Sequence, residues 1–122
     1  MGSVNIFEGR VTRDEVDHIR VDSADLGGQI HVTHGVSCTL GQKLWVAVRP
    51  EKALLTRDRP QGAVNGAAGT VGEVAYMGNL SVYRVTLDSG KVVSVTKPNI
   101  RRHDDDRLRS GDPAFVSWGA LP

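Results

Sequence analysis

The sequence predicts an all-β protein, and two observations support this class. Several segments alternate polar and apolar residues, most clearly residues 80–87, which read Leu-Ser-Val-Tyr-Arg-Val-Thr-Leu. A period of two places one face of a strand on a core and the other in water. The 122 residues also include fourteen glycines, which indicate frequent tight turns instead of long helices.

The same alternation and the β-branched composition locate the individual strands. We expect strands, in chain order, over residues 4–12, 17–23, 28–33, 43–49, 52–56, 69–76, 80–88, 91–97 and 113–118. The sequence Asp88-Ser89-Gly90-Lys91 predicts a tight hairpin turn with Gly90 in the left-handed region. Short helical turns are expected at residues 36–42 and 97–102.

The charge balance and the cysteine content limit the partners and the compartment that the chain fits. Fifteen basic residues nearly balance fourteen acidic ones, so no long-range field draws in nucleic acid or an anionic membrane. Cys38 is the only cysteine and has no partner for an intrachain disulfide, which fits a reducing compartment such as the cytoplasm. We interpret Cys38 as a half-buried strand residue. We expect neither a signal peptide nor a segment that inserts into a bilayer.

The chain repeats itself. Two pairs of segments match, namely 9–11 (Gly-Arg-Val) with 69–71 (Gly-Thr-Val), and 41–48 with 111–118, where each run begins with glycine and holds an aromatic residue followed by valine. This repeat predicts two related barrel-like subdomains, which we place at residues 1–60 and 61–122. The glycine- and proline-containing residues 57–68 are the expected junction, and the charged stretch 98–112 is an expected solvated loop.

No catalytic motif is visible in these 122 residues. The sequence contains no phosphate-binding loop, no dinucleotide-binding glycine pattern and no nucleophile turn, so we expect a chain that is not an enzyme and holds no metal or cofactor. His31 and His34 fall on opposite faces of the expected strand, and surface positions explain them better than a metal site. The run Asp104-Asp105-Asp106 is flanked by arginines, which favours a solvated loop over a cation site.

The aromatic residues leave two interpretations open. Trp45, Trp118, Tyr76 and Tyr83 could form a stacking platform for single-stranded nucleic acid. That platform normally needs a basic groove, and the net charge here is only +1. Trp45 and Trp118 also lie in the repeated apolar strands, so we expect both to pack in the core.

Residues 48–52 (Val-Arg-Pro-Glu-Lys) carry the most informative local pattern. Arg49 precedes a proline and must be extended, and Pro50 ends a strand ladder. Glu51 then lies close enough to pair with Arg49 or with a neighbouring chain. This segment resembles the Val-Arg-Pro-Glu signature of transport-associated OB (TOBE) domains, which follow the nucleotide-binding domain in many ABC importer ATPases.

The resemblance continues along the chain. Residues 69–83 match the family's G-x-V-x-x-x-x-Y-x-G-x-x-x-x-Y segment, in a form similar to the putrescine and spermidine subgroup. Gly2–Phe7 resembles the segment that leaves the nucleotide-binding domain. The residues that carry the motifs are Arg49, Pro50, Glu51, Gly69, Tyr76, Gly78, Tyr83, Asn99, Gly111 and Trp118.

The resemblance implies a fold and a role. The expected fold is a β-barrel of the OB or molybdate-binding-protein (MOP) type, in two small tandem units. In the family this region packs against its copy in the ATPase dimer and modulates transport. The parent would bind ATP and Mg²⁺ in a domain of about 200 or more residues before Met1. It would import polyamine together with transmembrane permease subunits. The subunit itself would lie at the cytoplasmic side of the inner membrane.

Two alternatives remain beside this reading. An oxyanion-binding module of the molybdate type would use backbone amides and polar side chains, which Ser94, Thr96, Lys97 and Asn99 could supply. A nucleic-acid-binding OB-fold is the weaker alternative, because charge and aromatic content disfavour it.

Overall fold

Nine strands and one short 3-10 helix form the part of the chain that a computed structural model describes, residues 4–15, 18–33, 39–98 and 108–119. In chain order the elements are β1 (Asn5–Asp14), β2 (Ile19–Ser23), β3 (Gly28–Val32), β4 (Lys43–Val48), η1 (Pro50–Lys52), β5 (Leu54–Thr56), β6 (Asn65–Met77), β7 (Leu80–Leu87), β8 (Val92–Pro98) and β9 (Pro113–Trp118). The predicted all-β class is confirmed.

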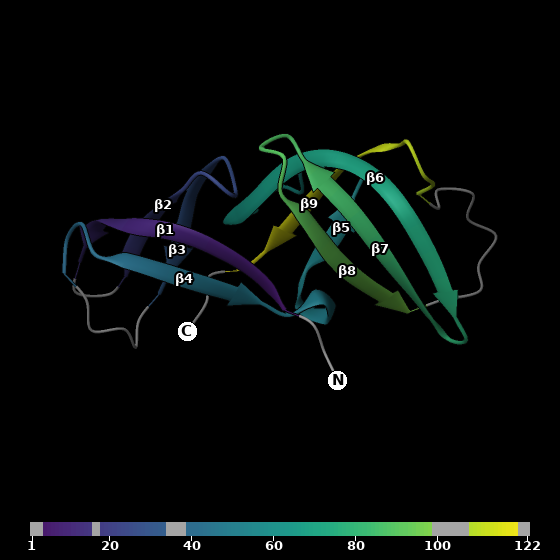
Figure 1. Cartoon of the computed structure of the whole chain (residues 1–122), viewed down its shortest axis with the longest axis horizontal. Helices are drawn as coiled ribbons and strands as arrows, with labels where there is room; N and C mark the ends of the chain where they lie inside the picture. The colour runs from purple at the N-terminus through teal and green to yellow at the C-terminus, as the bar shows by residue number, and fades with distance from the viewer. Residues whose placement is uncertain (1–3, 16–17, 34–38, 99–107, 120–122) are drawn as a thin grey trace.

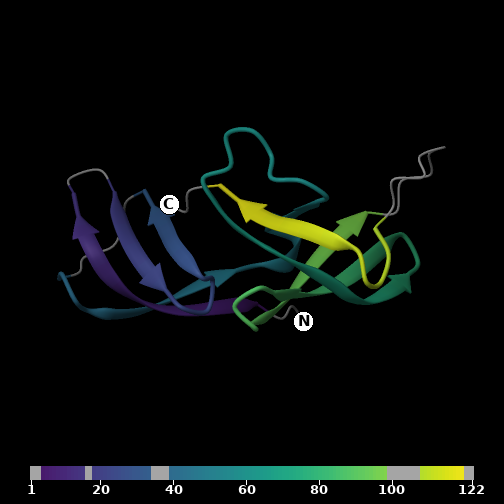
Figure 2. The ribbon, with the colours of Figure 1, turned by 90° about the horizontal axis from the view of Figure 1, so that it is seen from above.

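The strands make two antiparallel sheets that lie side by side along the long axis of the molecule (Figures 1 and 2). The first sheet has the order β3-β2-β1-β4, and the second has the order β5-β9-β6-β7-β8. The short strand β5 follows η1 and crosses to the second sheet, where it pairs with β9. The division of the chain at residue 60 stays a prediction.

One hydrophobic core runs through both sheets. The strands alternate as expected: in β1 every second residue from Asn5 to Val11 is buried, and β7 buries Val85 and Leu87. The two halves meet where the Phe7 ring of β1 stacks on Trp118 of β9, with ring centroids 5.3 Å apart. Because this stack joins strands of different sheets, neither half buries its apolar surface alone.

The same pattern of backbone hydrogen bonds occurs within each half. Val11 accepts a hydrogen bond from Gly41 N–H at 2.8 Å and donates to the Gln42 carbonyl at 3.0 Å. In the second half Val71 accepts from Gly111 N–H at 2.7 Å and donates to the Asp112 carbonyl at 2.9 Å. The sequence similarity between the two pairs of segments therefore corresponds to the same local structure.

Two asparagine side chains join the halves, and each one reaches from its own half to an edge strand of the other. Asn5, at the start of β1, donates to the Ser94 carbonyl and accepts from Ser94 N–H, both at 2.8 Å. Asn65, at the start of β6, accepts from His31 N–H at 2.6 Å and donates to the His31 carbonyl at 3.1 Å. Each amide thus continues the backbone pairing of an edge strand, β8 or β3, that belongs to the other sheet.

Three expectations about local structure are wrong. β6 begins at Asn65, so residues 65–68 of the expected junction are strand. The described helical turn lies at Pro50–Lys52, where proline starts a 3-10 helix, and was not predicted. Lys97 ends the expected strand 91–97 and begins the helical turn expected at 97–102; it belongs with Pro98 to β8, so the strand is confirmed at Lys97 and the helical turn is wrong at both residues. The remaining residues of that turn, and residues 36–38 of the other, lie outside the described part of the chain, whereas residues 39–42 form a turn and no helix.

Trp45 is the clearest failed prediction about the core. Its side chain is 62% exposed, whereas Trp118 is buried at 4% exposure as expected. In register Trp45 lies opposite Glu8 on the outer face of the first sheet. The segment 44–48 is almost continuously apolar, so alternation could not decide which face turns inward.

Within the described ranges, no helix is long and apolar enough to cross a membrane.

Candidate functional site

The segment that links the two sheets places the Val-Arg-Pro-Glu signature at a sharp corner. Arg49 is extended, with φ −72° and ψ 141°, and Pro50 is the buried first residue of η1. Lys52 N–H donates to the Arg49 carbonyl at 2.9 Å and closes the turn. Proline at the first helical position needs no hydrogen-bond acceptor, so the sequence folds locally into this corner.

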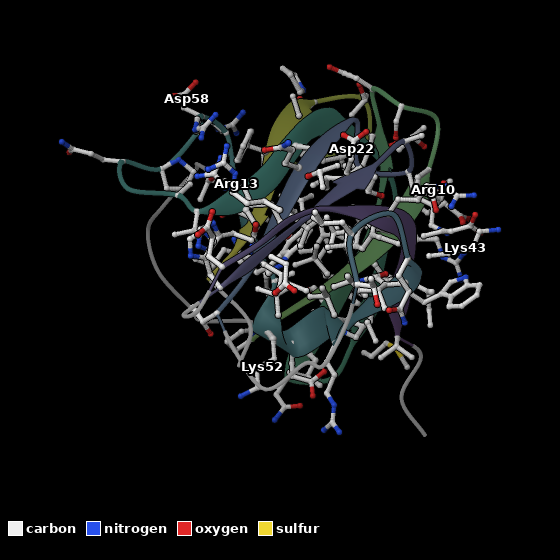
Figure 3. The ribbon with its side chains drawn as sticks, turned by 90° about the vertical axis from the view of Figure 1, so that its left-hand side faces the viewer. Arg10, Arg13, Asp22, Lys43, Lys52 and Asp58 are labelled. Atoms are coloured by element: carbon white, nitrogen blue, oxygen red, sulfur yellow. The ribbon has the colours of Figure 1, made fainter. Side chains whose placement is uncertain are left out.

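The charged side chains of the corner point into solvent. Arg49, Glu51 and Lys52 are all exposed, and Figure 3 shows Lys52 projecting away from the sheets. Among the ion pairs between described residues, none joins Arg49 to Glu51, so the expected intrachain pair is not formed. Both charges are therefore available to another surface, which is the second possibility that the sequence left open.

The Lys97 side chain bridges the two edge strands of the second sheet. Its ammonium donates to the Leu55 carbonyl of β5 at 3.3 Å and lies 5.9 Å from the centroid of the buried Tyr83 ring. β5 and β8 are the outermost strands of this sheet. The side chain therefore joins them and has a structural partner of its own, with a cation–π contact to the ring.

The polar residues proposed for an oxyanion site lie on two faces of β8. Val93 and Val95 are buried, and Lys97 follows them with the same period toward the barrel interior. Ser94 and Thr96 alternate with them and lie opposite Arg84 and Val82 of β7 on the outer face. The structure does not bring Lys97 together with the two hydroxyls, and Asn99 lies outside the described residues.

Most of the motif residues have structural roles. Gly78 and Gly111 have φ of 66° and 93°, which favours glycine, and an added Cβ at Gly69 would lie 2.5 Å from the Thr86 carbonyl oxygen. The left-handed conformation expected at Gly90 is confirmed by its φ of 99°. Tyr83 and Trp118 are buried, whereas Tyr76 is 57% exposed near the tip of the β6–β7 hairpin.

Two histidines form a pair that the sequence did not reveal. The rings of His18 and His31 stack with centroids 4.6 Å apart and an interplanar angle of 11°. Both are half-buried, and no group of three His, Cys, Asp or Glu side chains that could hold a metal ion occurs among the described residues. His34, His103, Cys38 and residues 104–106 lie outside them.

Asn5 and Asn65 are the residues that sequence reasoning missed. Each precedes the repeated glycine, Gly9 or Gly69, by four positions, and this shared spacing was the available signal. Aligning the repeat from these asparagines would have marked both as equivalent. Their role depends on contacts with residues 89 and 34 positions away, which the spacing does not reveal.

The comparisons with known proteins agree with the sequence motifs. Residues 46–120 match the family model described as "TOBE domain". The chain is 36% identical over 118 residues to the putrescine transport ATP-binding protein PotG of Escherichia coli (strain K12), and 32% identical over 125 residues to the spermidine/putrescine import ATP-binding protein PotA of Thermobifida fusca (strain YX). Each match covers 97% of this chain and 31% or 30% of the relative, so the chain spans about a third of their length.

A solved structure shares the fold. The cytoplasmic molybdate-binding protein ModG, in a form with molybdate bound, matches with a TM-score of 0.76 and 17% identity, covering 96% of this chain and 91% of ModG. At this identity the similarity establishes architecture, and it confirms the predicted OB-like, MOP-like barrel class. From its family match, its homology to polyamine importer ATP-binding proteins and its fold, the chain belongs to the TOBE domain family.

Proposed function

We propose that this chain is a regulatory and dimerisation region of the ATP-binding subunit of a polyamine-type ABC importer. The observation that carries the proposal is the match to PotG, which covers almost the whole chain but only 31% of PotG. The 122 residues contain no phosphate-binding loop. Nucleotide chemistry would therefore belong to the remainder of a longer parent, and this region would act through its surfaces.

The described surfaces suit such a role. The charged corner at Arg49, Glu51 and Lys52 projects from a rigid turn, since Pro50 is buried beneath it. In the proposed parent, ATP and Mg²⁺ bind outside this region, and transmembrane permease subunits use the energy of hydrolysis to import polyamine. The parent would reside at the cytoplasmic face of the inner membrane, and two copies of this region would contact each other.

The test uses the parent subunit assembled with its permease partners in liposomes. Deletion of the region equivalent to residues 4–119 should leave nucleotide binding intact while changing the rate of ATP hydrolysis and its coupling to putrescine uptake. Replacement of Arg49 and Glu51 by alanine should reproduce part of this effect without unfolding the protein. Unchanged hydrolysis and uptake after the deletion would refute a regulatory role.

An oxyanion-binding module is the second candidate, and it draws on the architecture shared with ModG. Titration calorimetry of the chain with molybdate tests it, with sulfate as the matched control. Saturable heat with molybdate alone would favour this candidate. The separation of Ser94 and Thr96 from Lys97 on opposite faces of β8 gives the importer role the stronger support.

A further inference from the structure

Two histidine side chains share the outer face of the first sheet. His31 is on β3, and His18 directly precedes β2. Ile19 lies opposite Val32 and both are buried, so the residues beside them in each strand face outward. Arg20 is the residue opposite His31, and His18 lies diagonally across the two strands from His31. This placement brings the two imidazole rings into their stack, with centroids 4.6 Å apart.

The backbone of His31 belongs to the junction between the halves. Its N–H donates to Asn65 Oδ1 at 2.6 Å, and its carbonyl accepts from Asn65 Nδ2 at 3.1 Å. On the other side of the stack, the His18 carbonyl accepts a hydrogen bond from Glu15 N–H at 2.8 Å, which joins the end of β1 to the start of β2. Since β3 is an edge strand, the ring stack is a side-chain contact that holds it on β2 beside the point where Asn65 binds.

Charged residues lie along the strands that neighbour the stack. β3 carries no other ionisable side chain, and those along this part of β1 and β2 are Arg10, Arg13, Asp14, Glu15, Arg20 and Asp22. Glu15 forms an ion pair with Arg13 at 3.5 Å. β6, which meets β3 at the junction, has no ionisable side chain over residues 65–68. The residue directly opposite His31 is therefore a cation, Arg20, and not a carboxylate that would welcome a proton on the ring.

The two rings respond differently to one proton and to two. Neutral imidazoles stack favourably, and a single imidazolium is attracted to the face of the neutral ring beside it. Two imidazolium cations at this separation repel each other. Coulomb's law lowers the affinity for the second proton by about fivefold in fully aqueous surroundings, and by roughly a few hundredfold at the effective dielectric constant near a protein surface. Both rings are half-buried, so the penalty lies between these limits.

We propose that the His18–His31 stack is a proton-sensitive contact that sets how firmly β3 is held at the junction of the two halves. The stack keeps its geometry when it binds its first proton. The second proton, bound on acidification, separates the rings and weakens the hydrogen bonds between His31 and Asn65. Histidine side chains change charge between about pH 5 and 8, so the contact responds within that range. The proposal concerns the chain itself and does not rest on the importer role.

The direction of the pH dependence follows from counting protons in the folded and unfolded chain. In the unfolded chain the two histidines are separated and bind protons independently. The folded chain binds the second proton less readily, because the rings repel each other when both are charged. Below about pH 6.5 the unfolded state therefore holds more protons, and stability falls as the pH falls. Carboxylates begin to add their own effect only near about pH 4, which leaves a window where the stack acts alone.

Titration of the imidazole ring protons by nuclear magnetic resonance tests the coupling between the two rings. In the wild-type chain, the last protonation step of the pair should need a proton concentration at least about tenfold higher than the single step in His18→Gln or in His31→Gln. Each variant keeps a polar side chain and removes one of the two charges. Identical, simple one-proton curves in the wild-type chain and in both variants would refute the coupling.

Amide hydrogen exchange tests the effect on the junction, and the repeat supplies a matched control. Ser94 N–H donates to Asn5 Oδ1 at 2.8 Å, as His31 N–H donates to Asn65, but this equivalent contact has no stacked histidine pair beside it. From about pH 7.5 to about pH 5, the protection factor of the His31 amide should fall by more than about tenfold. That of the Ser94 amide should change by less than about threefold.

His18→Phe separates the effect of charge from the effect of the ring. Phenylalanine keeps an aromatic face for the His31 ring and cannot be protonated, so a charged His31 stays stacked by cation–π attraction. Protection of the His31 amide should then become as insensitive to pH as that of Ser94. Selective loss at His31 that His18→Phe abolishes supports the proposal. A His31 amide that loses protection equally in His18→Phe, or in parallel with Ser94, overturns it.

Discussion

The Asn65 side chain pairs with the backbone of His31 as a neighbouring strand would, with Oδ1 2.6 Å from His31 N and Nδ2 3.1 Å from the His31 carbonyl oxygen. The same nitrogen lies 3.2 Å from the Gly119 carbonyl oxygen, so one side chain joins β3, β6 and the end of β9. Asn65 is only 1% exposed. Since buried backbone groups are costly when unpaired, this contact holds the two sheets together.

Replacement of either asparagine by alanine should therefore destabilise the whole chain. Asn65→Ala and Asn5→Ala each remove two or more hydrogen bonds and leave a backbone N–H and carbonyl of an edge strand unpaired. We expect a loss of about 1–3 kcal/mol in the free energy of unfolding for each, measured by urea denaturation. Gln29→Ala, an exposed amide on β3, should cost under about 0.5 kcal/mol. Equal losses in all three variants would contradict this role.

Trp118 offers a test of an unpaired polar atom. Its Nε1 is buried and has no hydrogen-bond partner in the described structure, although the ring stacks on Phe7. Trp118→Phe removes the unpaired N–H and keeps an aromatic ring, so its stability should lie within about 1 kcal/mol of wild type. Trp118→Ala should cost about 3–5 kcal/mol through the cavity that it leaves.

Trp45→Ala is the control, because it removes a tryptophan that is exposed instead of buried. Thermal unfolding of this variant and of the Trp118 variants separates the effect of burial from the effect of removing a tryptophan. Trp45 is 62% exposed, so its truncation should change the stability of the monomer by less than about 1 kcal/mol. If Trp118→Phe proves as damaging as Trp118→Ala, the indole N–H has a partner, and this assignment is wrong.

Gly78 should tolerate asparagine better than valine. Its φ of 66° lies in the left-handed region, and an added Cβ would meet no atom within 4 Å, so the cost of substitution comes from the backbone alone. Gly78→Val should lower the free energy of unfolding by more than about 1 kcal/mol, and Gly78→Asn by less, because asparagine adopts this region more readily. An unchanged melting midpoint in Gly78→Val would refute the strain.

Gly69 should be sensitive for a different reason. An added Cβ would lie 2.5 Å from the Thr86 carbonyl oxygen and 2.9 Å from Leu87 Cα, both backbone atoms of β7. Gly69→Ala must therefore separate two paired strands, and we expect a loss of about 1–3 kcal/mol. Gly28→Ala is the matched control, since a Cβ there has open space and should be nearly neutral. Similar urea midpoints for the two variants would sink the steric argument.

The isolated chain should neither bind nor hydrolyse ATP. Its sequence contains no glycine-rich amide cradle followed by Lys and Ser or Thr, the arrangement that holds nucleotide phosphates. Equilibrium dialysis with ATP and Mg²⁺ should show no saturable binding at millimolar nucleotide. Hydrolysis that persists through repeated purification at constant specific activity would place catalysis within this region and contradict the proposed function.

The sequence by itself determined the elements whose signals are local. Alternation over residues 80–87 predicted β7, because a strand with one buried face needs that period. Gly90 marked a tight turn, because glycine adopts a positive φ at little cost. The motifs from Arg49 to Trp118 identified the family, since an ordered series of weak matches is specific where each one alone is not.

Tertiary structure alone decided which faces turn inward and how the halves join. The apolar run in β4 fits either face, and only its register with β1 turned Trp45 toward solvent, opposite Glu8. Asn5 and Asn65 resemble ordinary polar residues until β8 and β3 present unpaired backbone groups to them. Such roles depend on contacts between residues far apart in the chain, whereas periodicity and turn chemistry report only neighbours a few positions away.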